Sequence, residues 1–153
     1  ARAGRHPQLF EQVELWRQGY AQLAIGLIRG NHDRRAGEIP PAWNFDPLGD
    51  CIQAGPFVLC HEPAPSDQGH VLAGHLHPAG RLHGVAGQRI KVPCFWLIPG
   101  VTILPAFSLF VDGLPILPAH EDRILAVTPD AVIPIESAYQ SPALEHDGGF
   151  VLN

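Results

Sequence analysis

The chain has 153 residues, of which 46% are hydrophobic, and no apolar run of 18 residues predicts a membrane-spanning helix. No basic segment followed by an apolar one opens the chain, so the sequence does not support a secretion signal. The net charge is −5, and residues 92–153 carry one basic side chain against seven acidic ones, which excludes a long basic stripe for nucleic acid over that part.

The first part of the chain predicts one helix and one strand. Residues 8–18 place apolar side chains at helical spacing, so they predict an amphipathic helix. The apolar run at 23–28 predicts a buried strand that ends before a glycine. Residues 36–50 contain three prolines and predict a loop.

The rest of the chain predicts short strands joined by tight turns. Residues 52–59 predict a hairpin that turns at Ala54-Gly55-Pro56. Further predicted strands lie within 70–73, 88–111, 123–127 and 131–135. Residues 136–153 show no hydrophobic period, so we expect a domain over 1–135 followed by a mobile tail.

The chain has three cysteines, Cys51, Cys60 and Cys94. Their odd number and the lack of a Cys-x-x-Cys spacing argue against a disulfide framework or a zinc ribbon. We therefore expect reduced thiols and a cytoplasmic location.

Histidine motifs follow three of the predicted strands. They are Gly30-Asn31-His32-Asp33, the single His61, and Gly74-His75-Leu76-His77. Because open α/β sheets bind ligands beyond the carboxyl ends of their strands, we expect the three groups to meet. Imidazole and oxygen ligands without thiolate suit Mn²⁺, Fe²⁺ or Zn²⁺. Taken singly, each motif has a structural alternative, such as a surface turn stabilised by Asx hydrogen bonds.

The residue types suggest separate roles within these motifs. Asn31 offers a neutral carbonyl oxygen, and His32 can act on the phosphate charge or the leaving oxygen of a substrate. Asp33 can orient the His32 imidazole, with a helix N-cap as the alternative role. His75 and His77 would leave one face of an extended segment, from which two imidazoles reach two adjacent metals.

The order of the motifs resembles the calcineurin-like metallophosphoesterase superfamily. Within it, several blocks are similar to the bacterial DNA-ligase-associated metallophosphoesterases, and the likeness covers about residues 9–135. These blocks are Arg29–Gly37, Cys60–Pro63, Ala73–Pro78 and Val92–Phe95. The resemblance implies a four-layer α/β/β/α sandwich with the site between two sheets. It also implies a nuclease or phosphodiesterase encoded beside a DNA ligase, a helicase and an exonuclease of a DNA-repair cluster.

The resemblance also implies a two-metal centre, with Mn²⁺ as the first choice, in which the ions hold the phosphate and generate hydroxide. It assigns Asn31, His61 and His75 to one metal, His77 to the other, and catalysis to His32.

Arg34 and Arg35 are candidate phosphate contacts, with solvated surface charge as the alternative. Two motifs of the family, Asp-x-His and Gly-Asp-x-x-Asp/His, are not found before Gly30. We therefore expect an N-terminally incomplete domain that is inactive, or nearly so, by itself. The alternatives are a small-molecule phosphodiesterase or phosphomonoesterase, and a non-catalytic remnant that binds a partner.

Overall fold

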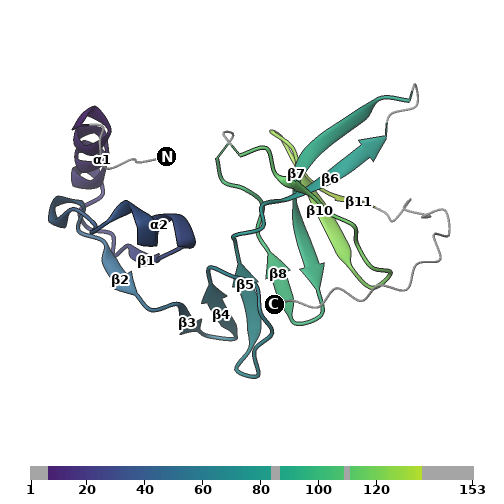
Figure 1. The fold of residues 1–153 in the computed structure, drawn as a ribbon, viewed down its shortest axis with the longest axis horizontal. Coiled ribbons are helices and arrows are strands. Elements are labelled where there is room, and N and C mark those ends of the chain that lie inside the picture. The colour runs from purple at the N-terminus through teal and green to yellow at the C-terminus, as the bar shows by residue number, and fades with distance from the viewer. Residues whose placement is uncertain (1–6, 84–86, 109–110, 136–153) are drawn as a thin grey trace.

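The computed structural model describes residues 7–83, 87–108 and 111–135, so the tail expected over 136–153 lies outside the described part. Two parts follow one another along the chain (Figure 1). We call residues 7–48 the N-terminal lobe and residues 51–135 the sheet lobe. Together they make a sheet-rich α/β fold with few helices.

Short elements make up the N-terminal lobe. They are α1 (Pro7–Gly19), β1 (Gly26–Ile28), α2 (Asn31–Ala36), the 3-10 helix η2 (Pro41–Trp43) and β2 (Asp46–Leu48). The helix predicted over 8–18 is confirmed as α1. None of the described helices is long and apolar enough to cross a membrane.

Two expectations for the N-terminal lobe are wrong. The predicted loop over 36–50 contains β2, which pairs in parallel with β1 as a separate two-stranded sheet. The predicted burial of β1 is also not observed, since its side chains are exposed or half-buried. The reason is that β2 is the single strand paired with β1 among the described residues, so this small sheet forms no interior.

Hydrogen bonds from a buried arginine hold the N-terminal lobe together. Arg17, near the end of α1, is 3% exposed. Its guanidinium donates to the carbonyl oxygens of Leu23 at 2.7 Å and Asn44 at 3.3 Å, and also to that of Tyr20. These charge-assisted bonds join α1 to the chain before β1 and before β2.

The sheet lobe is one mixed sheet of nine strands. Its strands are β3 (Cys51–Ala54), β4 (Phe57–Cys60), β5 (His70–Ala73), β6 (Pro78–His83), β7 (Arg89–Ile98), β8 (Val101–Ile103), β9 (Leu114–Pro115), β10 (Arg123–Val127) and β11 (Val132–Ile135). Seven run in the order β11-β10-β7-β8-β5-β4-β3, while β6 pairs with β7 and β9. The predicted strands are thus confirmed, including the hairpins β3–β4 and β10–β11.

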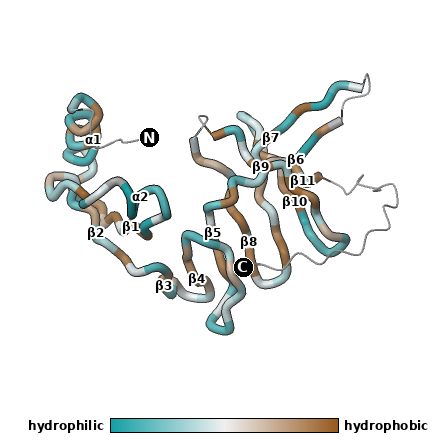
Figure 2. Tube along the Cα trace, in the orientation of Figure 1, coloured by the Kyte–Doolittle hydropathy of each residue, from teal (hydrophilic) through white to brown (hydrophobic). Residues whose placement is uncertain are grey.

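The apolar core lies in the sheet lobe. Figure 2 shows hydrophobic residues along β5, β8 and β10. The central cluster comes from β4, β5 and β8, and each of its side chains is 5% exposed or less. Its members are Val58, Val71, Ala73, Val101 and Ile103. A second cluster contains Cys94, Ile116 and Ile124.

Cys51 and Cys60 form a disulfide, so the expectation of reduced thiols is wrong for these two residues. The β3–β4 register places them directly opposite each other, with their Cα atoms 4.4 Å apart. Directly opposed residues of an antiparallel pair come within disulfide reach. Cys94 is a free, buried thiol, and burial raises its pKa to about 11.

Candidate metal centre

Three parallel strands end side by side at one edge of the sheet lobe. The register pairs Cys60 of β4 with Ala73 of β5, and Ala73 with Ile103 of β8. Beyond that edge, the Gly74 N–H donates to the His61 carbonyl at 3.1 Å. The segments that follow β4 and β5 therefore carry their histidines to the same place, as parallel strands predict.

Asn31, His61 and His75 converge at this edge. The Asn31 Oδ1 atom lies 3.2 Å from His61 Nε2, and His75 Nδ1 lies 3.0 Å from the same nitrogen. The two imidazole rings meet edge to face, with centroids 4.9 Å apart. Asn31 begins α2 in the N-terminal lobe, so the cluster is built from both lobes.

The donor chemistry of this cluster fits a divalent cation. His61 Nε2 carries either one proton or one lone pair, so it cannot bond fully to both neighbours. Metal bonds of about 2.1 Å would hold neighbouring donor atoms roughly 3.0–3.4 Å apart, the spacing found around Nε2. In the described ranges, no three His, Cys, Asp or Glu side chains group closely enough to hold a metal, so this site depends on the Asn31 amide.

The surroundings of His61 favour its neutral form. Burial lowers its pKa from 6.5, and the neighbouring His75 lowers it further, against the opposing effect of the Glu62 and Asp33 carboxylates. A neutral imidazole keeps the lone pair that a metal needs.

Gly30 allows the N-terminal lobe to approach His61. A Cβ atom at Gly30 would lie 2.6 Å from Cε1 of the His61 ring and 2.9 Å from its Nε2. A Cβ atom at Gly74 would meet nothing nearer than 3.9 Å. The close backbone approach is therefore made by Gly30 and not by Gly74, a positioning role that the motif pattern did not reveal.

His75 and His77 do not leave one face of an extended segment, contrary to the expectation. Both have left-handed backbone, with φ of 66° and 49°, and the Leu76 N–H donates to the Gly74 carbonyl at 2.8 Å. The chain turns here to pass from β5 into β6, so the period-two geometry of a strand does not apply. Such conformations cost about 1–3 kcal/mol each and cluster at functional sites.

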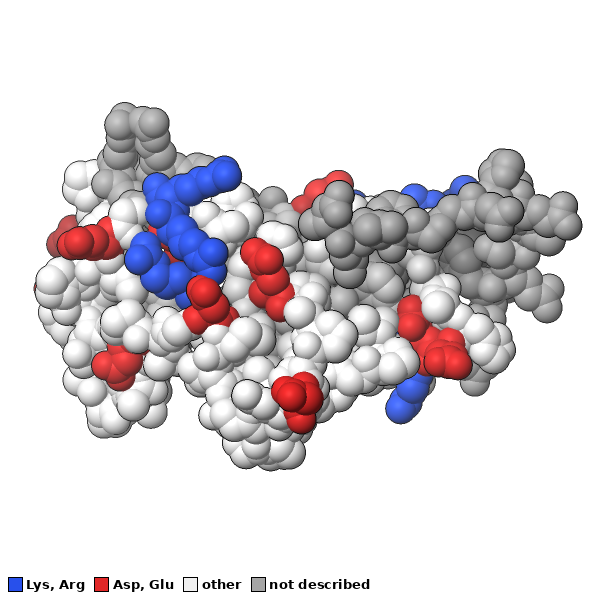
Figure 3. Space-filling view, turned by 60° about the horizontal axis from the view of Figure 1, so that its bottom comes forward, with Lys and Arg blue, Asp and Glu red and all other residues white. Residues whose placement is uncertain are grey.

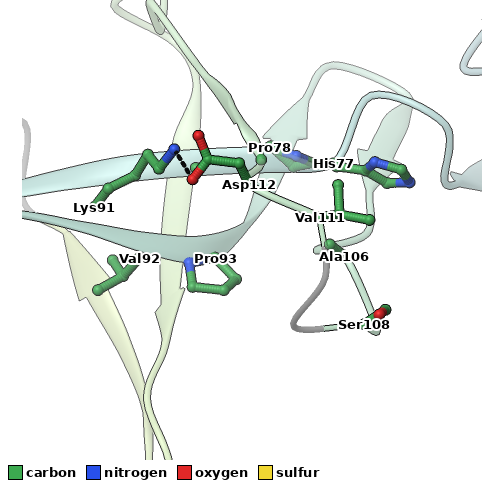
Figure 4. Close-up of a pocket in the computed structure, with 11 residues that line it drawn as sticks. His77, Pro78, Lys91, Val92, Pro93, Ala106, Ser108, Val111 and Asp112 are labelled. Carbon is green, nitrogen blue, oxygen red and sulfur yellow. Dashed lines mark ion pairs between the residues drawn. The ribbon is translucent and has the colours of Figure 1, made fainter.

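The two histidines have different contacts. His77 lines a cavity beside β6 and β7 (Figure 4). Within the described residues, no hydrogen bond or ring contact joins His77 to the cluster formed by Asn31, His61 and His75.

His32 and Asp33 lie in the first turn of α2. The His32 side chain is exposed, next along the chain to Asn31. The Asp33 carboxylate accepts the Gly30 N–H at 2.9 Å, so it caps α2. The expected contact between Asp33 and the His32 imidazole is absent from the described residues.

The arginines near α2 differ in how they are bonded. Figure 3 shows basic side chains gathered over the N-terminal lobe at the left, with acidic side chains around them. Arg29 donates to the carbonyls of Asp33, within α2, and of Gly37, just after it. Arg34 pairs with Asp50 at 2.6 Å on the surface, whereas Arg35 is exposed without a described partner.

Among solved structures, the chain is similar to the Pseudomonas putida nuclease MPE. The two chains are 37% identical and superpose with a TM-score of 0.74, and the match covers 88% of this chain and 66% of the nuclease chain. No family model matches this chain, and a search of curated proteins finds no match. Over most of its own length, the protein therefore shares its fold with a nuclease.

Proposed function

We propose that the protein is a metal-dependent phosphodiesterase of the calcineurin-like metallophosphoesterase superfamily that acts on nucleic acid, with DNA as the substrate class. The observation that carries the proposal is the meeting of Asn31 Oδ1 and His75 Nδ1 at His61 Nε2. Similarity to a nuclease supports the same chemistry. The four-layer sandwich and a role beside a DNA ligase, a helicase and an exonuclease in repair are parts of this proposal.

In this proposal, Asn31, His61 and His75 hold one divalent ion, with Mn²⁺ favoured by the mixture of imidazole and oxygen donors. His77 contributes to a second ion. Two such ions would hold the phosphate and lower the pKa of a bound water. Because no described hydrogen bond or ring contact joins His77 to the cluster, we propose that this chain binds one ion tightly and has low activity by itself.

The remaining candidate residues act on the substrate. His32 is exposed beside Asn31, so its imidazole is free to donate a proton to the leaving oxygen. Arg34 and Arg35 project from α2 and contact phosphates on either side of the scissile bond. Asp33 keeps the start of α2 in place through Gly30.

Metal stoichiometry tests the centre directly. We expect titration with Mn²⁺ to give one tightly bound ion per chain and His61→Ala to abolish this binding. His77→Ala should leave the tight ion in place, as should His120→Ala, which changes an exposed histidine outside the cluster. Two tightly bound ions, or full binding by the His61→Ala variant, would contradict the assignment.

Cleavage of a labelled single-stranded DNA oligonucleotide, with protein in excess over DNA, tests the activity. We expect slow Mn²⁺-dependent cleavage that EDTA stops, and a roughly 10²- to 10⁴-fold lower rate for His32→Ala, the range of general acid catalysis. The Mn²⁺ stoichiometry of that variant should not change. Cleavage that survives His61→Ala would overturn the proposal, and faster release of phosphate from a simple monoester would favour a small-molecule phosphatase.

A further inference from the structure

A third loop leaves the same sheet edge as the metal cluster. β8 runs parallel to β5, and the Leu104 N–H donates to the Ala73 carbonyl at 2.7 Å just beyond the paired strand ends. The residues that follow β8 therefore start beside the segment that carries His75. Among them is Phe107, whose side chain is fully exposed.

The residues on both sides of Phe107 line the cavity that contains His77. This cavity has a volume of about 200 Å³. Figure 4 shows Ala106 and Ser108 on the same side as His77, while Lys91 and Asp112 lie across from them. A candidate metal ligand and a charged pair therefore line the same cavity.

The lining combines apolar faces with one polar end. The exposed Pro93 ring presents an apolar surface and the half-buried Val92 adds a further apolar contact, whereas Pro78 is fully buried. At the polar end, Lys91 Nζ lies 2.6 Å from Asp112 Oδ1. The cavity thus offers an apolar surface together with one cationic donor and one carboxylate acceptor.

We propose that this cavity, with Phe107 at its rim, binds one unpaired nucleobase next to the scissile phosphate. A base has flat faces that stack on aromatic and apolar side chains, and edges that accept from a lysine and donate to a carboxylate. The bases of a duplex are already stacked on one another, so a base must leave the stack to enter the cavity. This inference rests on the proposed function and adds a base-binding subsite to it.

The test compares two labelled strands of equal length and equal phosphate charge, one oligothymidylate and one with abasic residues throughout. Binding to the full chain is measured with Mn²⁺ by fluorescence anisotropy. We expect the wild type to prefer the base-bearing strand by roughly 5- to 100-fold, the range of base–aromatic stacking. Phe107→Ala should lose most of this preference, and Phe107→Trp should keep it.

Leu117→Ala is the matched control, because Leu117 is 81% exposed and does not line the cavity. It should bind both strands as the wild type does. Equal binding of the two strands by the wild type would overturn the base subsite and leave the proposed function standing. Failure of both strands to bind would overturn both proposals, and equal losses in Phe107→Ala and Leu117→Ala would remove the role of Phe107.

Discussion

The two lobes are stabilised by different means. In the sheet lobe, the described apolar clusters join strands distant in sequence, and Val71 and Ala73 are fully buried. In the N-terminal lobe, the one buried charged residue, Arg17, bonds to backbone carbonyls, and large apolar side chains such as Leu15 and Trp16 are exposed. We expect the sheet lobe to unfold as a cooperative unit and the N-terminal lobe to open at lower free energy.

This difference matters because the candidate metal centre takes donors from both lobes. His61 and His75 follow strands of the buried core, whereas Asn31 begins a six-residue helix of the less densely packed lobe. The spacing between the two histidines is therefore set by the sheet register. The distance from Asn31 to His61 depends instead on how the N-terminal lobe docks.

The largest expected effect is on the sheet core. Ile103→Ala removes a side chain that is 2% exposed, which should lower the free energy of unfolding by about 2–5 kcal/mol in urea titrations. Leu15→Ala, at a position that is 61% exposed in α1, should change it by less than about 0.5 kcal/mol. Similar losses in the two variants would show that the lobes do not differ.

A smaller, local effect is expected at Arg17. Arg17→Met keeps most of the apolar stem but leaves the Leu23 and Asn44 carbonyl oxygens without their donor, at a cost of about 1–3 kcal/mol for a buried unpaired group. The Tyr20 carbonyl keeps the Leu23 N–H as a donor. Hydrogen exchange should accelerate in α1 and in the β1–β2 pair and stay unchanged in β5 and β8. Faster exchange in β5 and β8 as well would mean that the lobes unfold together.

The docking of the two lobes is tested at Gly30. Gly30→Ala places a methyl group 2.6 Å from the His61 ring, which must move. We expect Mn²⁺ affinity to fall by roughly 10- to 100-fold, as for other residues that orient metal ligands. Gly19→Ala is the control, since a Cβ atom there meets nothing within 4 Å. Unchanged Mn²⁺ affinity in Gly30→Ala would contradict the close approach.

The smallest expected effect is the pH dependence of the metal-free protein. Because the pKa of folded His61 lies below 6.5, unfolded chains bind more protons than folded ones as the pH falls below that value. The stability contribution of His61 is therefore present above pH 6.5 and is lost as the pH drops through the lowered pKa. His61→Gln should flatten the urea midpoint between pH 7.5 and 5.5, and an equally steep profile would count against this cause.

The sequence predicted the strands of the sheet lobe because each is a short apolar run between turn residues, as in the β3–β4 hairpin. It also placed three histidine groups after strand ends, and parallel pairing of β4 with β5 explains why two of them meet. Local patterns did not reveal β2, whose Pro47 is unusual in a strand and whose partner lies about twenty residues earlier.

Other features depend on tertiary contacts or on register. Cys51 and Cys60 are the same number of residues from the hairpin turn, so the register places them opposite each other and they form a disulfide. A search for Cys-x-x-Cys spacing does not detect such a pair. The left-handed backbone of His75 and His77 belongs to the turn between β5 and β6, which the strand pattern did not predict. The proximity of Gly30 to the His61 ring appears only once the two lobes are packed together.

Because the connection between the lobes is short, metal binding would also affect how firmly the N-terminal lobe docks on the sheet lobe. β2 ends at Leu48 and β3 begins at Cys51, so two residues join the lobes, and Asp50 in this connection pairs with Arg34 of α2. A cation held by Asn31 and His61 would link the two lobes at a second point, besides this short connection. At a free metal concentration 100 times the dissociation constant, this link would stabilise the docked arrangement of the two lobes by about 2.7 kcal/mol. Metal supply would then control the rigidity of the N-terminal lobe as well as its chemistry.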